Sequence, residues 1–175
     1  MLCFLEGWRK QIFMAFAGFL LVKNRHMTLR EMLVLWTVVQ VGVWLVAPAT
    51  GRIIDRVGER RVLTFYYLSL AAIFCGYAVF QSKWVLAGLF MVDNLMFTLG
   101  MALTTYARRI APPEEHTPTL SMGVAMNHVA AVTMPLVGGL LWRYLGYQWT
   151  FGMGAGAAAL SLLAVARLPR HERAG

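Results

Sequence analysis

Charged side chains are scarce in this sequence, and acidic side chains are the scarcest. Only 14% of the 175 residues are charged, whereas soluble proteins carry about 25%. Hydrophobic residues make up 59%, and the mean hydropathy is +0.60. A soluble chain of this length cannot bury so much apolar surface in one core. The composition therefore excludes a soluble domain and predicts a protein embedded in a lipid bilayer.

Cysteine is also rare, because the chain holds only Cys3 and Cys75. Two isolated cysteines provide neither a disulfide framework nor the paired spacing of a metal site. The four histidines lack metal-ligand spacing, and the sequence contains no nucleophile elbow and no phosphate-binding loop. We therefore expect no metal site, no cofactor and no enzymatic activity.

Basic residues outnumber acidic ones, and the formal net charge is +8. A basic chain can bind nucleic acid. Here, however, the charges form short clusters between long apolar runs, with no basic helix face. This pattern is typical of loops between membrane spans. We expect the bilayer as the chain's environment and no nucleic-acid partner.

The apolar runs divide the chain into six segments, each close to the ~20 residues that a helix needs to cross a bilayer. Because backbone polar groups must be satisfied within a segment in lipid, the segments are expected to be helical. The sequence thus predicts an all-α, polytopic transmembrane bundle forming one membrane domain over residues 1–175. The expected helices are 1–22, 32–50, 62–80, 84–106, 121–142 and 147–166.

The distribution of Lys and Arg predicts how this bundle is oriented. One side carries four in 51–61, two in 107–120 and three in the basic tail 167–175, nine in all. The other side carries three in 23–31, with Lys83 and Arg143, five in all. The positive-inside rule then places both termini in the cytoplasm. The expected location is a plasma or inner membrane, crossed several times, although the cluster in 23–31 argues for the opposite orientation.

Residues 51–61 form a compact basic motif between the second and third segments. Its spacing is Gly-x-x-x-Asp-Arg-x-Gly-x-Arg-Arg, beginning at Gly51. This motif resembles the signature loop of the major facilitator superfamily, which lies between helices two and three of a six-helix half. The alternative is a solvated basic loop that only anchors the two helix ends.

The resemblance covers nearly the whole chain but only half of a transporter. Residues 7–22 resemble the first helix of a C-terminal half, and 91–109 and 119–151 resemble its fourth to sixth helices. The resemblance implies transport of a small solute by alternating access between two six-helix halves. The second half would be a missing N-terminal half, a second copy or a partner chain. The alternative is a truncated or split half that does not transport alone and acts as an assembly subunit.

The resemblance also implies that residues 51–61 act as a conformational latch. Asp55 and the neighbouring arginines would pair with a helix end of the other half and hold one access state. The residues expected in this latch are Gly51, Asp55, Arg56, Gly58, Arg60 and Arg61.

Four charged residues fall inside the expected spans: Glu6, Arg9, Lys10 and Asp93. A charge at membrane depth costs ~2.5–3.5 kcal/mol on insertion scales, so such residues usually face a cavity and pair. By the resemblance, the first and fourth helices line the central cavity. Arg9 and Lys10 would then hold an anionic group, and Asp93 a proton or a cationic group. Alternatively the charges neutralise one another, Glu6 with Lys10 at i, i+4 and Asp93 with Arg9.

Other polar residues inside the spans give weaker indications. Asn94 and His128, together with Gln40 and Asn127, could line the cavity or could hydrogen-bond between helices. His128 could also serve proton coupling. Several glycines in the last two segments are expected to allow close helix packing. They are Gly138, Gly139, Gly152, Gly154 and Gly156.

Overall fold

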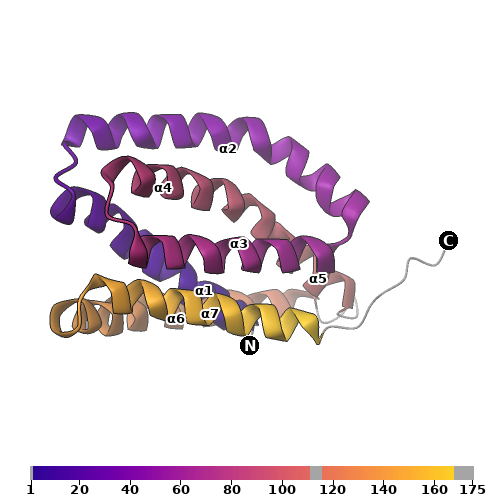
Figure 1. Ribbon diagram of the computed structural model, residues 1–175. Coiled ribbons are helices and arrows are strands. Elements are labelled where there is room, and N and C mark those ends of the chain that lie inside the picture. The colour runs from indigo at the N-terminus through magenta and orange to yellow at the C-terminus, as the bar shows by residue number, and fades with distance from the viewer. Residues whose placement is uncertain (1, 111–115, 168–175) are drawn as a thin grey trace.

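Every regular element in the described part of the chain is helical. The computed structural model describes residues 2–110 and 116–167, drawn in Figure 1. The first half of the chain forms α1 (Leu2–Ile12), η1 (Phe13–Ala17), η2 (Leu20–Asn24), α2 (Leu29–Val57) and α3 (Glu59–Val79). The second half forms α4 (Lys83–Phe97), η3 (Thr98–Gly100), α5 (Met101–Ile110), α6 (His116–Tyr144) and α7 (Tyr147–Ala166).

These elements make six helical segments, as the sequence predicts. The first runs from α1 through two π-helical turns, η1 and η2, and the fourth runs from α4 through η3 into α5. Five helices in the described residues are long and apolar enough to cross a membrane: Leu29–Val57, Glu59–Val79, Lys83–Ala107, Leu120–Tyr144 and Tyr147–Ala166. The first segment is not among the five. It is divided by its π turns and carries four charged residues, Glu6, Arg9, Lys10 and Lys23.

The helices alternate in direction along the bundle (Figure 1). We call the end that carries the α2–α3 junction the Gly58 end, and it also holds the C-terminus of α7 (Figure 1). We call the opposite end the Thr28 end, and it holds the connections 25–28, 80–82 and 145–146. Residues 51–61, the C-terminus of α5, the N-terminus of α6 and Arg167 lie at the Gly58 end, so the described parts of the three basic clusters are at this end (Figure 1).

The core lies where α3 packs between α4 and α7 (Figure 1). The buried face of α3 is aromatic, and the Tyr77 and Phe151 rings stack with centroids 4.8 Å apart. Glycines let the helices approach closely, as expected. A Cβ built at Gly154 would collide with the Phe74 ring, and one at Gly138 would lie 2.5 Å from Phe16.

Only some of the five glycines expected to allow close helix packing lie against a neighbouring helix. A Cβ at Gly139, Gly152 or Gly156 would meet nothing within 4 Å. These three glycines therefore do not contribute to helix packing among the described residues. Their spacing in the sequence does not distinguish them from Gly138 and Gly154, since only the neighbouring helix decides which face is crowded.

Two of the six segments lie at the periphery. Only 6% of the apolar span in α2 and 17% of that in α6 are buried, against 50% in α3. Large apolar side chains stand exposed along α2, including Trp44 at 74%. Figure 1 shows α2 along one edge of the bundle, turning toward α3 in its second half, the half that contains Pro48. The uncovered faces of α2 and α6 matter below, because something other than this chain must cover them.

The segment 51–61 is not the loop that the sequence suggested. Residues 51–57 continue α2, Gly58 alone leaves helical geometry at φ 90°, and α3 begins at Glu59. The Gly58 N–H donates to the Ile54 carbonyl at 2.9 Å and closes α2. Glycine adopts this positive φ without steric cost. The expected bounds marked where hydrophobicity ends, whereas a helix continues as long as its own hydrogen bonds and caps support it.

Other helix ends differ from expectation for the same reason. The second helix begins at Leu29, because Thr28 and Glu31 form a capping box there. The fifth helical segment, α6, begins at His116 rather than at 121. Pro118 lies in its first turn, where proline is tolerated. The last helix occupies 147–166, as expected. Of the basic tail 167–175, only Arg167 lies among the described residues.

Candidate functional site

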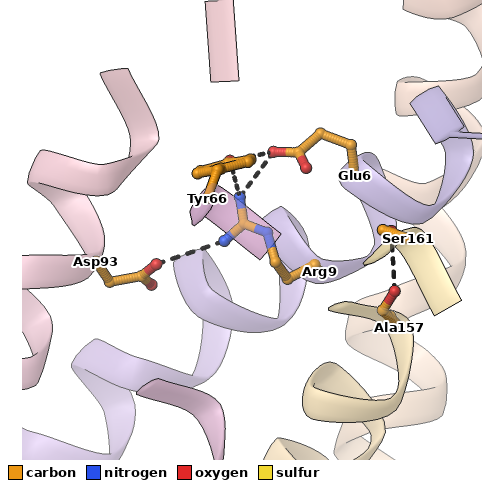
Figure 2. Close-up of polar contacts among 6 residues, drawn as sticks. All are labelled: Glu6, Arg9, Tyr66, Asp93, Ala157 and Ser161. Atoms are coloured by element: carbon orange, nitrogen blue, oxygen red, sulfur yellow. Dashed lines mark hydrogen bonds and ion pairs between the residues drawn. The ribbon is translucent and has the colours of Figure 1, made fainter. Parts of the chain in front are cut away.

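A buried charge cluster joins α1, α3 and α4 (Figure 2). Arg9 on α1 is 1% exposed and donates through Nη2 to Glu6 Oε1 at 2.8 Å and to the Tyr66 hydroxyl oxygen at 2.9 Å. Tyr66 on α3 donates in turn to Glu6 Oε1 at 2.6 Å. Asp93 on α4, also 1% exposed, faces the other arm of the guanidinium, with Nη1 to Oδ1 at 3.5 Å. We call Glu6, Arg9, Tyr66 and Asp93 the charge cluster.

The helix geometry explains how these groups meet. Glu6 and Arg9 lie three residues apart on α1 and therefore share one face. Tyr66 and Asp93 stand 57 and 84 residues away from Arg9 in sequence and arrive from α3 and α4. Gly100 lies against the cluster, since a Cβ there would be 3.2 Å from the Tyr66 hydroxyl. Ser161 on α7, drawn nearby in Figure 2, instead donates to Ala157 O in its own helix.

Arg9 is held unequally by its two carboxylates. The contact with Glu6 is 2.8 Å and is reinforced by the Tyr66 hydroxyl, whereas the contact with Asp93 is 3.5 Å. A charge-assisted hydrogen bond is normally about 2.7–2.9 Å long. The Arg9–Asp93 pair is therefore the weaker contact in the cluster and the one that a small helix movement would break first.

Each carboxylate in the cluster keeps one oxygen without a hydrogen bond in the described part of the protein. These atoms are Glu6 Oε2 and Asp93 Oδ2, and Arg9 Nε is similarly unpaired. Buried polar atoms without partners are costly, about 1–3 kcal/mol each. The cluster thus has capacity to accept a proton or a polar group in addition to its internal bonds.

Lys10 lies beside the cluster without joining it. Its side chain is half-buried, and Nζ stands 4.8 Å from the centre of the Phe97 ring. No salt bridge to Lys10 is formed by the described residues. If the charges neutralised one another, two ion pairs were expected, and only one of them forms. Asp93 does take Arg9, but Glu6 pairs with Arg9 instead of Lys10, which leaves the Lys10 charge uncompensated.

The other expected cavity residues make no hydrogen bond to the cluster in the described part of the chain. Asn94 donates to the Phe90 carbonyl of its own helix at 2.8 Å, and His128 is exposed on α6. Gln40 is exposed on α2. Asn127 lies against Gly7, and its buried Oδ1 has no hydrogen-bond partner in the described residues. Among residues 2–110 and 116–167, no three His, Cys, Asp or Glu side chains come together as a metal site.

The expected latch residues lie at the Gly58 end. Arg60 donates through Nη2 to the Ala166 carbonyl at 2.7 Å and so contacts the C-terminus of α7. Asp55, Arg56 and Arg61 are exposed, and the pairing of Asp55 with Arg56 or Arg60 is not seen in the described residues. Gly51 has open space at its Cβ position.

Tyr66 is the member of the cluster that sequence reasoning missed, and Glu6 was recognised only as a charge to be neutralised. The one signal for Tyr66 was a tyrosine in the middle of an apolar segment, because a buried hydroxyl usually needs a partner. Tyr67 and Tyr77 give the same signal on the same helix. Sequence alone therefore does not single out Tyr66.

Comparison with known proteins gives one family match. The sequence matches the family model described as "Major Facilitator Superfamily" over residues 1–175. No curated protein matches the chain. The family match covers the charge cluster, the Gly58 junction and all six helical segments.

Proposed function

The chain belongs to the Major Facilitator Superfamily, and from this premise we propose that it moves a small solute across a membrane by alternating access. Membership makes it a multi-pass membrane protein of transporter type and not an enzyme. The proposal also includes a substrate class, a coupling ion, a second six-helix half and an orientation in the membrane.

The charge cluster is the observation that supports this proposal most. Glu6, Arg9 and Asp93 stand within helical segments of a membrane protein, where each charge is costly. Charges retained at such depth commonly mark the path of a substrate or an ion. Because the cluster connects α1, α3 and α4, a change in its charge would act on three helices together.

We assign different roles to the two cations. Lys10 is half-buried and lacks an anionic partner in the described residues, so it suits first contact with an anionic group. Arg9 would bind the anionic group only after its long contact with Asp93 has opened. A proton arriving on Asp93 would remove its negative charge and release Arg9, which couples proton movement to solute binding. Asn94 and His128 are secondary candidates, since Asn94 donates its hydrogen bond to Phe90 O of its own helix and His128 is exposed on α6.

A second six-helix half would complete the transporter. The uncovered apolar faces of α2 and α6 support this, since the chain itself leaves them exposed. The likeness to a C-terminal half would make the partner an N-terminal half. Asp55, Arg56 and Arg61 at the Gly58 end are exposed and so could reach that half as a latch. The excess of Lys and Arg on the segments of this end supports a cytoplasmic location for it.

The proposal is tested by uptake into proteoliposomes containing the purified protein, with labelled organic anions and an imposed proton gradient. Arg9→Gln and Asp93→Asn should each lower the initial rate about tenfold or more, because a charge-assisted hydrogen bond contributes about 1.5–3 kcal/mol. Arg143→Gln removes an exposed charge at the Thr28 end and serves as the control. Uptake that survives both cluster substitutions would contradict the assigned roles.

The alternative, a half that does not transport alone, is favoured by the same exposed faces of α2 and α6. Its test is the size of the native product, measured by tagging the C-terminus at the chromosomal locus and blotting membranes. A band of roughly 40 kDa would indicate two halves in one polypeptide. A band near 19.6 kDa would indicate a separate half. Absence of uptake by that half alone and with every co-purifying partner would then favour the alternative.

A further inference from the structure

A groove with a volume of about 570 Å³ lies between α2 and α4 at the Thr28 end. Arg30 and Trp84 stand at its mouth, in the first turns of the two helices. Val34, Val38, Gly88 and Met91 line its deeper part. A Cβ at Gly88 would meet nothing within 4 Å, so the groove is open at that position.

The groove changes from charged to apolar along its length. Arg30 to Val38 covers eight residues of helix, which is about 12 Å at 1.5 Å per residue. The charged residues are at the mouth, and only aliphatic, methionine and glycine positions follow below. A ligand that fits must therefore have a charged head and an apolar tail. That is the form of a phospholipid lying parallel to the helices.

The charge at the mouth selects the sign of the head. Lys83 Nζ binds Glu31 Oε1 at 2.7 Å, so these two charges offset one another. Arg30 is exposed and makes no hydrogen bond or ion pair with the described residues. The mouth is thus left with one uncompensated positive charge, which favours an anionic head.

The first turn of α4 adds to this preference. Its N-cap, Ser82, makes no side-chain cap hydrogen bond. The first backbone N–H groups of a helix have no intrahelical acceptor and attract phosphate. Trp84, which is 69% exposed, has the amphipathic ring that commonly lies at the headgroup level of a bilayer.

We propose that this groove binds one anionic phospholipid. The phosphate lies between Arg30 and the N-terminus of α4, and an acyl chain runs past Val34 and Val38 over Gly88. This site does not depend on the proposed transport, because Glu6, Arg9, Tyr66 and Asp93 of the charge cluster do not line the groove.

Photolabelling of the protein in nanodiscs tests the site. The probe is phosphatidylglycerol with a diazirine on one acyl chain, in a phosphatidylcholine background, and adducts are mapped by peptide mass spectrometry. We expect adducts on residues 34–38 and 87–91. Arg30→Gln should weaken competition by unlabelled phosphatidylglycerol about fivefold, the effect expected from one basic residue near a membrane surface.

Gly88→Leu should remove labelling of the groove, because its side chain enters open space and occupies the acyl position. Gly156→Leu is the matched control, since Gly156 also faces open space but lies on α7. Arg143→Gln is the charge control at the same end. An unchanged unfolding temperature for Gly88→Leu would show that the loss of labelling is local.

Four results would overturn the proposal. The first is equal labelling of the Gly88→Leu and Gly156→Leu variants. The second is equal competition by phosphatidylcholine, which would mean nonspecific annular lipid. The third is competition by inorganic phosphate alone, which would mean an anion site without a lipid chain. The fourth is transfer of the label to a second polypeptide, which would mean that protein covers the groove.

Discussion

Among single residues, Arg9 combines nearly complete burial with a charge that is shared by two carboxylates. Removing one partner of a buried ion pair costs about 3–5 kcal/mol, whereas replacing a whole pair can be nearly neutral. The sequence identified Arg9, Asp93 and Glu6 as intramembrane charges. It did not decide which carboxylate takes which cation, since Glu6 can reach Arg9 or Lys10 on the same helix.

Tyr66 gives a prediction at this scale. Tyr66→Phe should lower the free energy of unfolding by about 1–3 kcal/mol, because the hydroxyl both donates to Glu6 and accepts from Arg9. The measurement is thermal unfolding in detergent. Tyr77→Phe is the matched control, since the Tyr77 hydroxyl is buried on the same helix without a hydrogen bond in the described residues. Equal losses for the two variants would contradict the role given to Tyr66.

At the scale of helices, one glycine of α7 lies in close contact with α3. Gly154 lies directly against the Phe74 ring, whereas Gly156, two residues on, faces open space. The sequence predicted close packing from the glycines of this segment but not which of them is in contact. That choice depends on the rotation of α7 relative to α3, and a nearly uniformly apolar helix does not reveal its rotation.

This difference predicts unequal effects of the same substitution. Gly154→Val should destabilise the protein by about 1–3 kcal/mol, because the added methyl groups force α3 and α7 apart. Gly156→Val should change stability by less than about 0.5 kcal/mol, as at other exposed positions. Chemical or thermal unfolding of both variants measures this, and a reversed order would mean that α7 is rotated from the position described.

At the scale of the whole molecule, the membrane spans differ in how much of each is buried by the rest of the chain. The spans in α3, α4–α5 and α7 are 39–50% buried, whereas those in α2 and α6 are far less so. Lipid alone could cover these faces, but a second six-helix half would cover them in a transporter of this family. The sequence predicted the need for a partner from its resemblance to half a transporter. Apart from the expected latch at 51–61, it gave no information on which helices would contact that partner.

Cross-linking tests this assembly. A cysteine at Trp44 on α2 should form a cross-link to another six-helix unit, because that position is 74% exposed on a peripheral helix. A cysteine at Leu68 on α3, which is 57% exposed, should remain unlinked, because we expect the second unit to cover α2 and α6 and not α3. Cys3 and Cys75 are replaced by serine beforehand. Cross-links at Leu68 and not at Trp44 would reverse the proposed interface.

The sequence by itself determined the class, the six helices and the family resemblance, because membrane insertion and helix formation depend on composition within about 20 consecutive residues. It also located the last helix, which begins directly after Gly146 and ends with the apolar run at Ala166. Tertiary structure decided the rest. The Arg9–Tyr66 and Arg9–Asp93 contacts join positions 57 and 84 residues apart. Such contacts, like the open groove at Gly88, follow from how helices rotate against one another, which no local pattern specifies.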